Sequence, residues 1–214
     1  MSHCRNPWSD ANLTSEHSEE ATSAPHLTQE MQTILRELER SCCAPDDITA
    51  QGAGVYALFL ADPLQLVPAG LAYIGSSHHL NRRLLQQHFR VRGTPQSSPR
   101  RSFGALLRTE LKLLPKGLGR GKFIFTDPGE EALTDWMRQH IEVGTCGVRL
   151  SRLTAVELAL IRGLRPALNL THSEGETTAE IRRLRRECAK SNQRSRTVTD
   201  YRRRTKDQGQ VTAL

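Results

Sequence analysis

The sequence predicts an α/β fold of the α+β type, in which a small central antiparallel sheet of about three strands is flanked by helices and carries a helical insertion. Two observations support this fold class. Residues 55–60 and 71–74 are short apolar runs bounded by Gly and Pro, as is typical of two strands joined in a hairpin. Segments whose apolar residues repeat at helical spacing precede and follow this hairpin.

Two segments precede the hairpin. Residues 1–27 are rich in Ser, Thr, Asn and Glu with little periodicity, so we predict that they are disordered. Residues 28–51 are predicted to form a helix and a linker. Thr28 is a suitable N-cap for the helix, whose apolar residues share one face (Met31, Ile34, Leu35 and Leu38). This face indicates that the helix packs on the core.

The predicted hairpin carries one tyrosine on each strand, Tyr56 and Tyr73. Side chains alternate between the two faces of a sheet, so pairing of the strands can bring both phenols onto one patch. A helix is predicted to follow from Ser77, and Arg83 flanks its apolar stripe (Leu80, Leu84, Leu85 and Phe89). Two phenols and a guanidinium form a place to hold a phosphodiester, because arginine can make two parallel hydrogen bonds to phosphate.

The next stretch, at about residues 93–147, is predicted to be the insertion. It opens with a loop and continues as an amphipathic helix over residues 103–114. Residues 122–126 are predicted to form a short strand, and residues 127–129 a turn into a second helix whose apolar stripe ends at Ile141.

The C-terminal part is predicted to supply the last elements of the core and to end in a segment outside it. Glycines within residues 144–147 interrupt the pattern, residues 148–150 are predicted to return as the third strand, and the helix at 153–164 closes the core. Residues 173–214 are rich in arginine and show only weak helical periodicity, so we predict a basic, flexible tail.

Composition narrows the class of protein. The net charge of +7 and the pI near 9.5 indicate a polyanionic partner. Hydrophobic residues make up 37%, the mean hydropathy is −0.52, and no apolar run approaches the ~20 residues of a membrane span, so no membrane partner is expected. The N-terminus lacks the apolar stretch of a secretory signal. Five cysteines without a Cys-x-x-Cys pair indicate a reduced, cytoplasmic location without structural zinc.

Four elements in a fixed order resemble the GIY-YIG nuclease family. Gly54-Val55-Tyr56 and Tyr73-Ile74-Gly75 correspond to the two triplets of the family pattern, and Arg83 follows on the next helix. Glu157 then precedes Leu160-Ile161 and the Pro-x-x-Asn turn at Pro166–Asn169. Each triplet alone carries no information, whereas the ordered set is specific. The resemblance implies a GIY-YIG endonuclease-like fold and places the nuclease domain at residues 52–172.

The resemblance also implies a Mg²⁺-dependent endonuclease that hydrolyses DNA phosphodiesters, with Mn²⁺ as a substitute metal. Glu157 corresponds to the metal ligand of the family, and one carboxylate suits Mg²⁺ because this ion keeps most of its waters and binds substrate phosphate. Tyr56 corresponds to the general base or the residue that positions water, with Tyr73 in support. Arg83 meets the charge of the transition state, and His88 assists proton transfer or contacts phosphate.

Three further residues complete the expected site as substrate-binding groups: Gly75, Asn169 and Arg82. For Arg82 the alternative is a solvated surface arginine. Asn169 is expected to orient the site through hydrogen bonds, and its alternative is a turn residue after Pro166. Where some members of the family have a lysine directly after the second triplet, this chain has Ser76.

Several individual assignments have structural alternatives. Thr154 and Glu157 also match a capping box, in which the glutamate would serve the start of a helix. Glu130 or Glu131 is a competing metal ligand, because a strand-like segment also precedes them. His88 could equally be a helix-end histidine beside the negative end of the helix dipole.

The alternative function is a non-catalytic nucleic-acid-binding protein that retains the GIY-YIG scaffold. A retired site tends to lose its glutamate or its arginine, and this sequence has both. The type of nuclease, its target and its oligomeric state do not follow from the sequence. A dimer is conceivable, since a site-specific cut through both strands normally needs two active sites.

Overall fold

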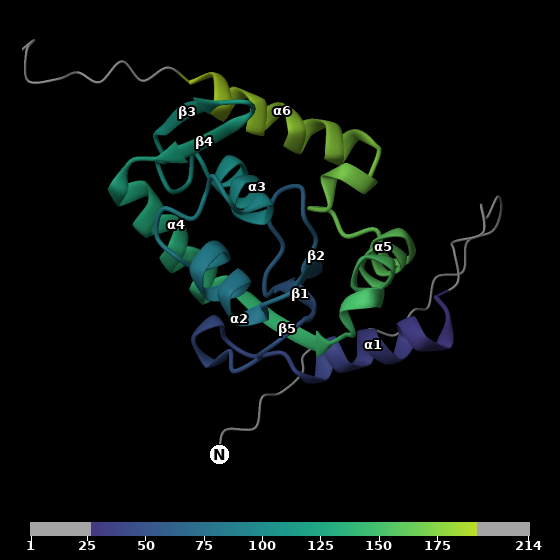
Figure 1. Cartoon of the computed structure of the whole chain (residues 1–214). Coiled ribbons are helices and arrows are strands. Elements are labelled where there is room, and N and C mark those ends of the chain that lie inside the picture. Colours follow the sequence, from purple (N-terminus) through teal and green to yellow (C-terminus); the bar gives the residue numbers. More distant parts are fainter. Residues whose placement is uncertain (1–26, 192–214) are drawn as a thin grey trace, which may run out of the picture.

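The structure, a computed structural model, describes residues 27–191 (Figure 1). Three strands, β1 (Gly54–Leu60), β2 (Gly70–Ser77) and β5 (Ile141–Gly147), form an antiparallel sheet in the order β2-β1-β5. Helices pack on both sides of this sheet, which confirms the predicted α+β fold class. The predicted disorder at residues 1–26 and the tail beyond residue 191 lie outside the described residues.

The central strand β1 is buried along its whole length and separates two apolar clusters. On one face, Val55, Ala57 and Phe59 pack against α1 (Gln29–Arg40) and α5 (Leu153–Leu164). On the other face, Tyr56, Leu58 and Leu60 join the larger core. The residues at 55–60 therefore alternate between two buried faces, which explains why the strand is apolar throughout.

Helix α1 begins where the sequence predicts. The Thr28 side chain accepts a hydrogen bond from the Met31 backbone N–H at 3.3 Å, which satisfies one of the free donors at the helix start. Leu38 is fully buried against the sheet. A Cβ atom at Gly144 of β5 would lie 2.0 Å from the Leu38 carbonyl oxygen, so glycine permits this close approach.

The third strand is not where the sequence predicts it. Residues 148–150 were expected to form it, and residues 144–147 to interrupt the chain, but β5 runs from Ile141 to Gly147. Pairing with β1 continues through Gly144 and Gly147, opposite Ala57 and Gly54. Gly144 thus serves close packing on α1 within the strand and does not end it.

The second side of the sheet carries the remaining elements. They are α2 (Leu80–Arg83) with its π-helical continuation η2 (Leu84–His88), α3 (Ser98–Leu106), the β3 (Pro115–Gly119) and β4 (Lys122–Phe125) hairpin, α4 (Asp127–His140) and α6 (Glu176–Lys190). Three short 3₁₀ turns connect other elements: η1 (Pro45–Asp47), η3 (Leu150–Arg152) and η4 (Leu170–His172).

Two elements of the inserted region differ from the prediction. The helix expected over residues 103–114 is α3, which starts earlier because the Ser97 side chain caps it by accepting the Arg100 N–H at 3.1 Å. It ends at Leu106, and Lys112 adopts a left-handed backbone with φ 51°. Strand β3 was not predicted; it pairs with β4, which was.

Helix α6 corrects the prediction of a flexible tail from residue 173. Residues 176–190 form a continuous helix whose buried face contains Thr178, Ile181 and Cys188. A Cβ atom at Gly117 of β3 would lie 2.2 Å from the Ala189 carbonyl oxygen, so the hairpin and the helix are in close contact. Figure 1 shows α6 lying along the β3–β4 hairpin, with α1 at the opposite end of the molecule.

Both outer strands of the sheet are bonded to short segments. On β2, the Asn169 side chain accepts from the Ile74 N–H at 2.9 Å and donates to the Ile74 carbonyl at 2.7 Å. The Leu168 N–H donates to Ala72 O at 3.0 Å. On β5, Cys43 and Val143 exchange two backbone hydrogen bonds. Among the described helices, none is long and apolar enough to cross a membrane.

Candidate active site

The two tyrosines of the hairpin lie side by side on one face of the sheet, as their alternation predicts. Their ring centroids are 6.2 Å apart. The Tyr56 side chain belongs to the central strand and is fully enclosed, whereas Tyr73, on the outer strand β2, retains 9% of its exposed surface. Tyr73 is therefore the more accessible of the two phenols.

The Tyr56 hydroxyl is shared by two residues that follow β2. His88 Nε2 lies 2.7 Å from Tyr56 Oη, and Arg83 Nε donates to the same oxygen at 3.2 Å. Arg83 also contacts the side chain of its helical neighbour Gln87. The structure thus brings together four of the residues that the sequence singles out as catalytic.

A π-helical turn explains how Arg83 and His88 reach one atom. In an α-helix, residues five positions apart point about 140° away from each other, since each residue turns by about 100°. Here the Phe89 N–H donates to the Leu84 carbonyl at 3.0 Å, five residues back, and the wider turn brings His88 to the side of Arg83. Such π turns occur frequently at functional sites.

Gly75 makes room for both phenols. A Cβ atom at this position would lie 2.4 Å from Tyr56 Oη and 2.9 Å from Tyr73 Cε1. No larger residue fits without moving a tyrosine, because real Cβ atoms essentially never approach other atoms closer than 3.0 Å. Glycine is therefore required at the end of the second triplet, because the Tyr56 hydroxyl of the first triplet occupies the space that a side chain would need.

Burial determines the charge state of these groups. It raises the pKa of the Tyr56 phenol well above its ordinary value, nearby Tyr73 adds to this, and the Arg83 guanidinium opposes it. Burial likewise raises the pKa of Tyr73 against the effect of Arg83. Burial lowers the pKa of His88 well below its ordinary range, and the positive charges of Arg83 and Arg100 lower it further. All three groups are neutral at pH 7.

Glu157 faces the sheet from the second turn of α5. Its Oε2 accepts a hydrogen bond from the Ser76 hydroxyl at 2.5 Å, and its charge raises the pKa of Tyr56 and Tyr73. The capping-box alternative is wrong, because α5 has Arg152 at its N-cap and Thr154 lies inside the helix without a capping bond. Ser76, directly after the second triplet, is thus a site residue that sequence reasoning did not assign.

The surroundings of Glu157 fit a hydrated cation held by one carboxylate. The side chain is partly exposed, and its Oε1 accepts no hydrogen bond from a residue within 27–191. No group of three or more His, Cys, Asp or Glu side chains gathers there or elsewhere in the described part of the chain. A metal ion at this position would take its other ligands from water and substrate, as Mg²⁺ does.

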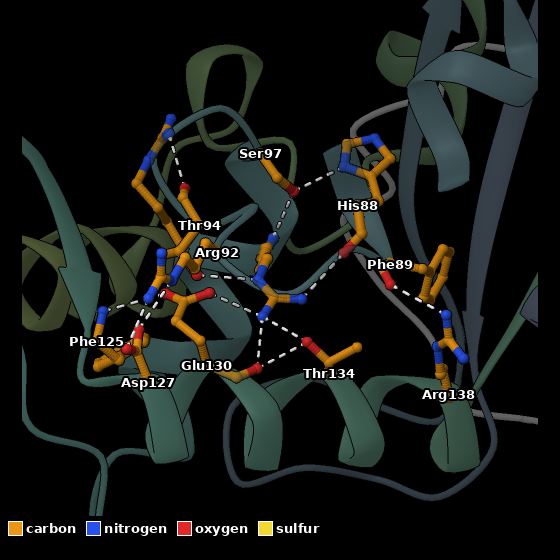
Figure 2. A network of polar contacts seen from close by, with 12 residues as sticks. His88, Phe89, Arg92, Thr94, Ser97, Phe125, Asp127, Glu130, Thr134 and Arg138 are labelled. Carbon is orange, nitrogen blue, oxygen red and sulfur yellow. Dashed lines mark hydrogen bonds and ion pairs between the residues drawn. The ribbon is translucent and has the colours of Figure 1, made fainter. Parts of the chain in front are cut away.

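The competing carboxylate, Glu130, belongs to a different environment. It is fully buried, where its Oε2 accepts from Arg100 Nη2 at 2.9 Å and its Oε1 accepts from the Phe125 N–H at 3.1 Å (Figure 2). Both oxygens are used inside the protein. Glu131 lies exposed on the outer side of α4. Neither residue therefore reaches the tyrosines.

The network around Glu130 nevertheless touches the site through His88. Ser97 Oγ lies 2.6 Å from His88 Nδ1, and Arg100 Nη1 donates to the His88 carbonyl at 3.2 Å (Figure 2). The same guanidinium donates to Thr94 Oγ1 at 2.9 Å and to Thr134 Oγ1 at 2.8 Å. His88 is therefore oriented through its ring and its backbone by the inserted region.

The remaining predicted residues lie apart from the phenols. The Asn169 side-chain amide forms two hydrogen bonds with the backbone of Ile74, the middle residue of the Tyr73–Gly75 triplet. Arg82 is exposed on α2, and its side chain makes no hydrogen bond or ion pair within residues 27–191, which agrees with a solvated arginine.

Comparison with known proteins agrees with this arrangement. The family model described as the GIY-YIG catalytic domain matches residues 65–191, more than half of the chain. The matched range contains Tyr73, Arg83, His88 and Glu157, and it extends through α6. None of the curated proteins and none of the solved structures compared matches the chain significantly. Members of the matched family are nucleases that act on DNA, and the chain belongs to this GIY-YIG family.

Proposed function

We propose that the protein is a Mg²⁺-dependent DNA endonuclease that hydrolyses phosphodiester bonds at the site formed by Tyr56, Tyr73, Arg83, His88 and Glu157. The observation that carries this proposal is the Tyr56 hydroxyl, which has a neutral histidine at 2.7 Å and an arginine at 3.2 Å. A general base and a phosphate-binding cation thus meet at one oxygen atom.

Tyr56 needs a partner in order to act as a base. Burial raises the pKa of its phenol, so a free phenolate is not available at neutral pH. His88 supplies the partner because burial keeps its imidazole neutral. In the tautomer whose Nδ1–H donates to Ser97, Nε2 accepts the phenol proton while Tyr56 takes a proton from the attacking water.

Arg83 connects the phenol to the phosphate. Its guanidinium is partly exposed, and Nε now donates to the enclosed Tyr56 hydroxyl. A bound phosphodiester would draw Arg83 toward its oxygens, because arginine–phosphate hydrogen bonds are charge-assisted and stronger. This movement opens Tyr56 to water and leaves the cation beside the charge that develops on phosphorus.

Glu157 would hold the metal through Oε1, while the Ser76 hydroxyl fixes the orientation of the carboxylate through Oε2. When bound, Mg²⁺ polarises the phosphate and neutralises part of its charge. The charge of Glu157 raises the pKa of both Tyr56 and Tyr73, so the carboxylate lies near enough to influence both phenols, which supports this assignment.

The experiment is Mg²⁺-dependent nicking of supercoiled plasmid by the parent protein, Glu157→Ala and Glu131→Ala, with DNA binding of each measured in parallel. We expect the parent and Glu131→Ala to nick and Glu157→Ala to bind without nicking. Glu131 is the matched control, because it is an exposed glutamate outside the site. We expect His88→Ala to nick at least about 100-fold more slowly, the lower end of the usual contribution of general acid–base catalysis.

Nicking by Glu157→Ala at the parental rate would refute the proposal. Binding without nicking by the parent, over a range of DNA structures and with both Mg²⁺ and Mn²⁺, would instead favour a non-catalytic nucleic-acid-binding protein.

A further inference from the structure

Two more arginines lie near Tyr73. They are Arg101 of α3 and Arg185 of α6, and the packing of these two helices brings them together. Arg101 lies close enough to Tyr73 and Arg83, and Arg185 close enough to Arg101 and Tyr73, for the charges to affect one another. A row of cations therefore leads from the phenols to α6.

Arg101 is held in place while part of its guanidinium stays unused. Its Nη1 donates to the Pro95 carbonyl at 2.7 Å and, at a longer 3.4 Å, to the Thr94 carbonyl. Its Nε is buried and has no hydrogen-bond partner among residues 27–191. A buried donor without an acceptor is costly, so hydrogen bonds within the described chain do not account for the position of this guanidinium.

Arg185 is equally short of acceptors. Its Nη1 reaches the hydroxyls of Ser98 and Ser102 only at 3.4 Å, a weak contact. Ser98, Arg101 and Ser102 share one face of α3 because they are spaced by three and four residues. Arg185 thus approaches α3 on the face that already carries a cation.

No carboxylate within residues 27–191 lies at ion-pairing distance from Arg101 or Arg185. Arg183 of the same helix shows the contrast, since it pairs with Glu180 and Glu187. Burial lowers the pKa of Arg185 to about 10, and repulsion by Arg101 contributes to this shift. Two partly buried like charges without a counter-ion destabilise the free protein, which is a common property of sites that bind an anion.

We propose that Arg101 and Arg185 form a second phosphate-binding site, which holds a backbone phosphate of the nucleic acid next to the phosphate that Arg83 contacts. The identity of the ligand as DNA rests on the proposed nuclease function. It extends the track of the substrate strand from Tyr73 across α3 to α6. Arginine suits this role because its planar fork donates two hydrogen bonds to one phosphate.

The test is the salt dependence of binding to a fluorescein-labelled DNA duplex, measured by fluorescence anisotropy in EDTA so that no cleavage occurs. Arg101→Gln and Arg185→Gln are compared with Arg36→Gln, which removes the same charge from an exposed position on α1. We expect each of the first two variants to raise Kd about tenfold, as for one lost charge-assisted contact. The magnitude of the negative slope of log K against log salt should decrease by about 0.9. Arg36→Gln should change neither quantity by this much.

Thermal unfolding without DNA separates a binding role from a structural one. Removing one of two like charges leaves Arg185→Gln with a Tm equal to or above that of the parent, although its DNA affinity falls. A Tm loss that parallels the affinity loss would overturn the proposal. If Arg101→Gln does not fold, Arg101→Lys keeps the charge and should retain the salt slope while it weakens binding.

Plasmid nicking by the parent distinguishes the two proposals. If the parent nicks DNA and both glutamine variants bind with the parental affinity and slope, the second phosphate site is refuted and the nuclease function stands. If the magnitude of the slope decreases as expected but the parent does not nick, the phosphate site stands and the nuclease function is refuted.

Discussion

Replacing Arg100 by methionine tests how the inserted region supports the site. The Arg100 side chain is fully buried and donates to Thr94, His88, Glu130 and Thr134. The substitution leaves the Glu130 carboxylate buried without its cation. Breaking a buried ion pair in this way costs about 3–5 kcal/mol, so we expect a decrease in Tm of about 6–20 °C.

The double variant Arg100→Met/Glu130→Leu removes both charges and should recover much of this loss. Recovery is incomplete, because the Phe125 N–H then loses its acceptor, Glu130 Oε1, at a cost of about 1–3 kcal/mol. The double variant therefore lies between the parent and Arg100→Met in free energy of unfolding. Urea titration at constant pH measures all three.

Arg92→Met is the matched control, because Arg92 forms its ion pair with Asp127 at the surface, where both side chains are more than half exposed. Solvent weakens such pairs, and the control should unfold at the parental urea concentration. Equal stability of Arg100→Met and Arg92→Met would refute a stabilising role of the buried Arg100–Glu130 pair. At temperatures where the double variant is folded, its nicking rate should still fall by up to about 100-fold, because His88 loses the bond that fixes its backbone.

Three further variants test the site itself. Gly75→Ala places a Cβ atom 2.4 Å from the Tyr56 hydroxyl and 2.5 Å from Tyr56 Cζ, and it should lower the free energy of unfolding by about 1–3 kcal/mol. Equal stability of Gly75→Ala and the parent in urea would contradict this packing. Since burial lowers the pKa of His88, the unfolded chain binds more protons than the folded one, so the parent should lose stability as the pH falls below about 6.5. His88→Gln should lessen the difference between the urea midpoints at pH 7 and pH 5. An undiminished difference would show that other groups cause the pH dependence. Asn169→Asp replaces the donor to the Ile74 carbonyl by an acceptor and should lower the Tm at pH 7. The loss should be smaller at acid pH, where the protonated carboxyl can donate. A Tm loss that does not depend on pH would exclude this cause.

Local patterns in the sequence are sufficient to predict much of the framework. Helix α1 shows its N-cap and its apolar face within thirteen residues, and the fold class follows from a hairpin flanked by such helices. The approach of Tyr56 and Tyr73 follows from strand alternation alone. These features depend on spacing within one element or on the pairing of two neighbouring strands, which the printed sequence contains.

Other features depend on contacts between distant segments, which no local pattern contains. The residues of β5 form a strand because they pair with β1, and the need for glycine at position 144 follows only from its contact with α1. Ser76 and Glu157 are 81 positions apart. Arg100 is the clearest case, because arginine ordinarily lies at the surface and no pattern in residues 97–102 predicts a buried guanidinium.

The bonded outer strands of the sheet have a consequence for self-assembly. An exposed strand edge is a template on which a second chain can add a strand, and proteins that stay soluble protect such edges. On β2 the outward groups of Ala72 and Ile74 already bond to Leu168 and Asn169, and on β5 those of Val143 bond to Cys43. Two copies of this chain therefore cannot join their sheets at these positions without unfolding their own edges. A dimer that cuts both DNA strands would therefore have to form through surfaces other than these strand positions.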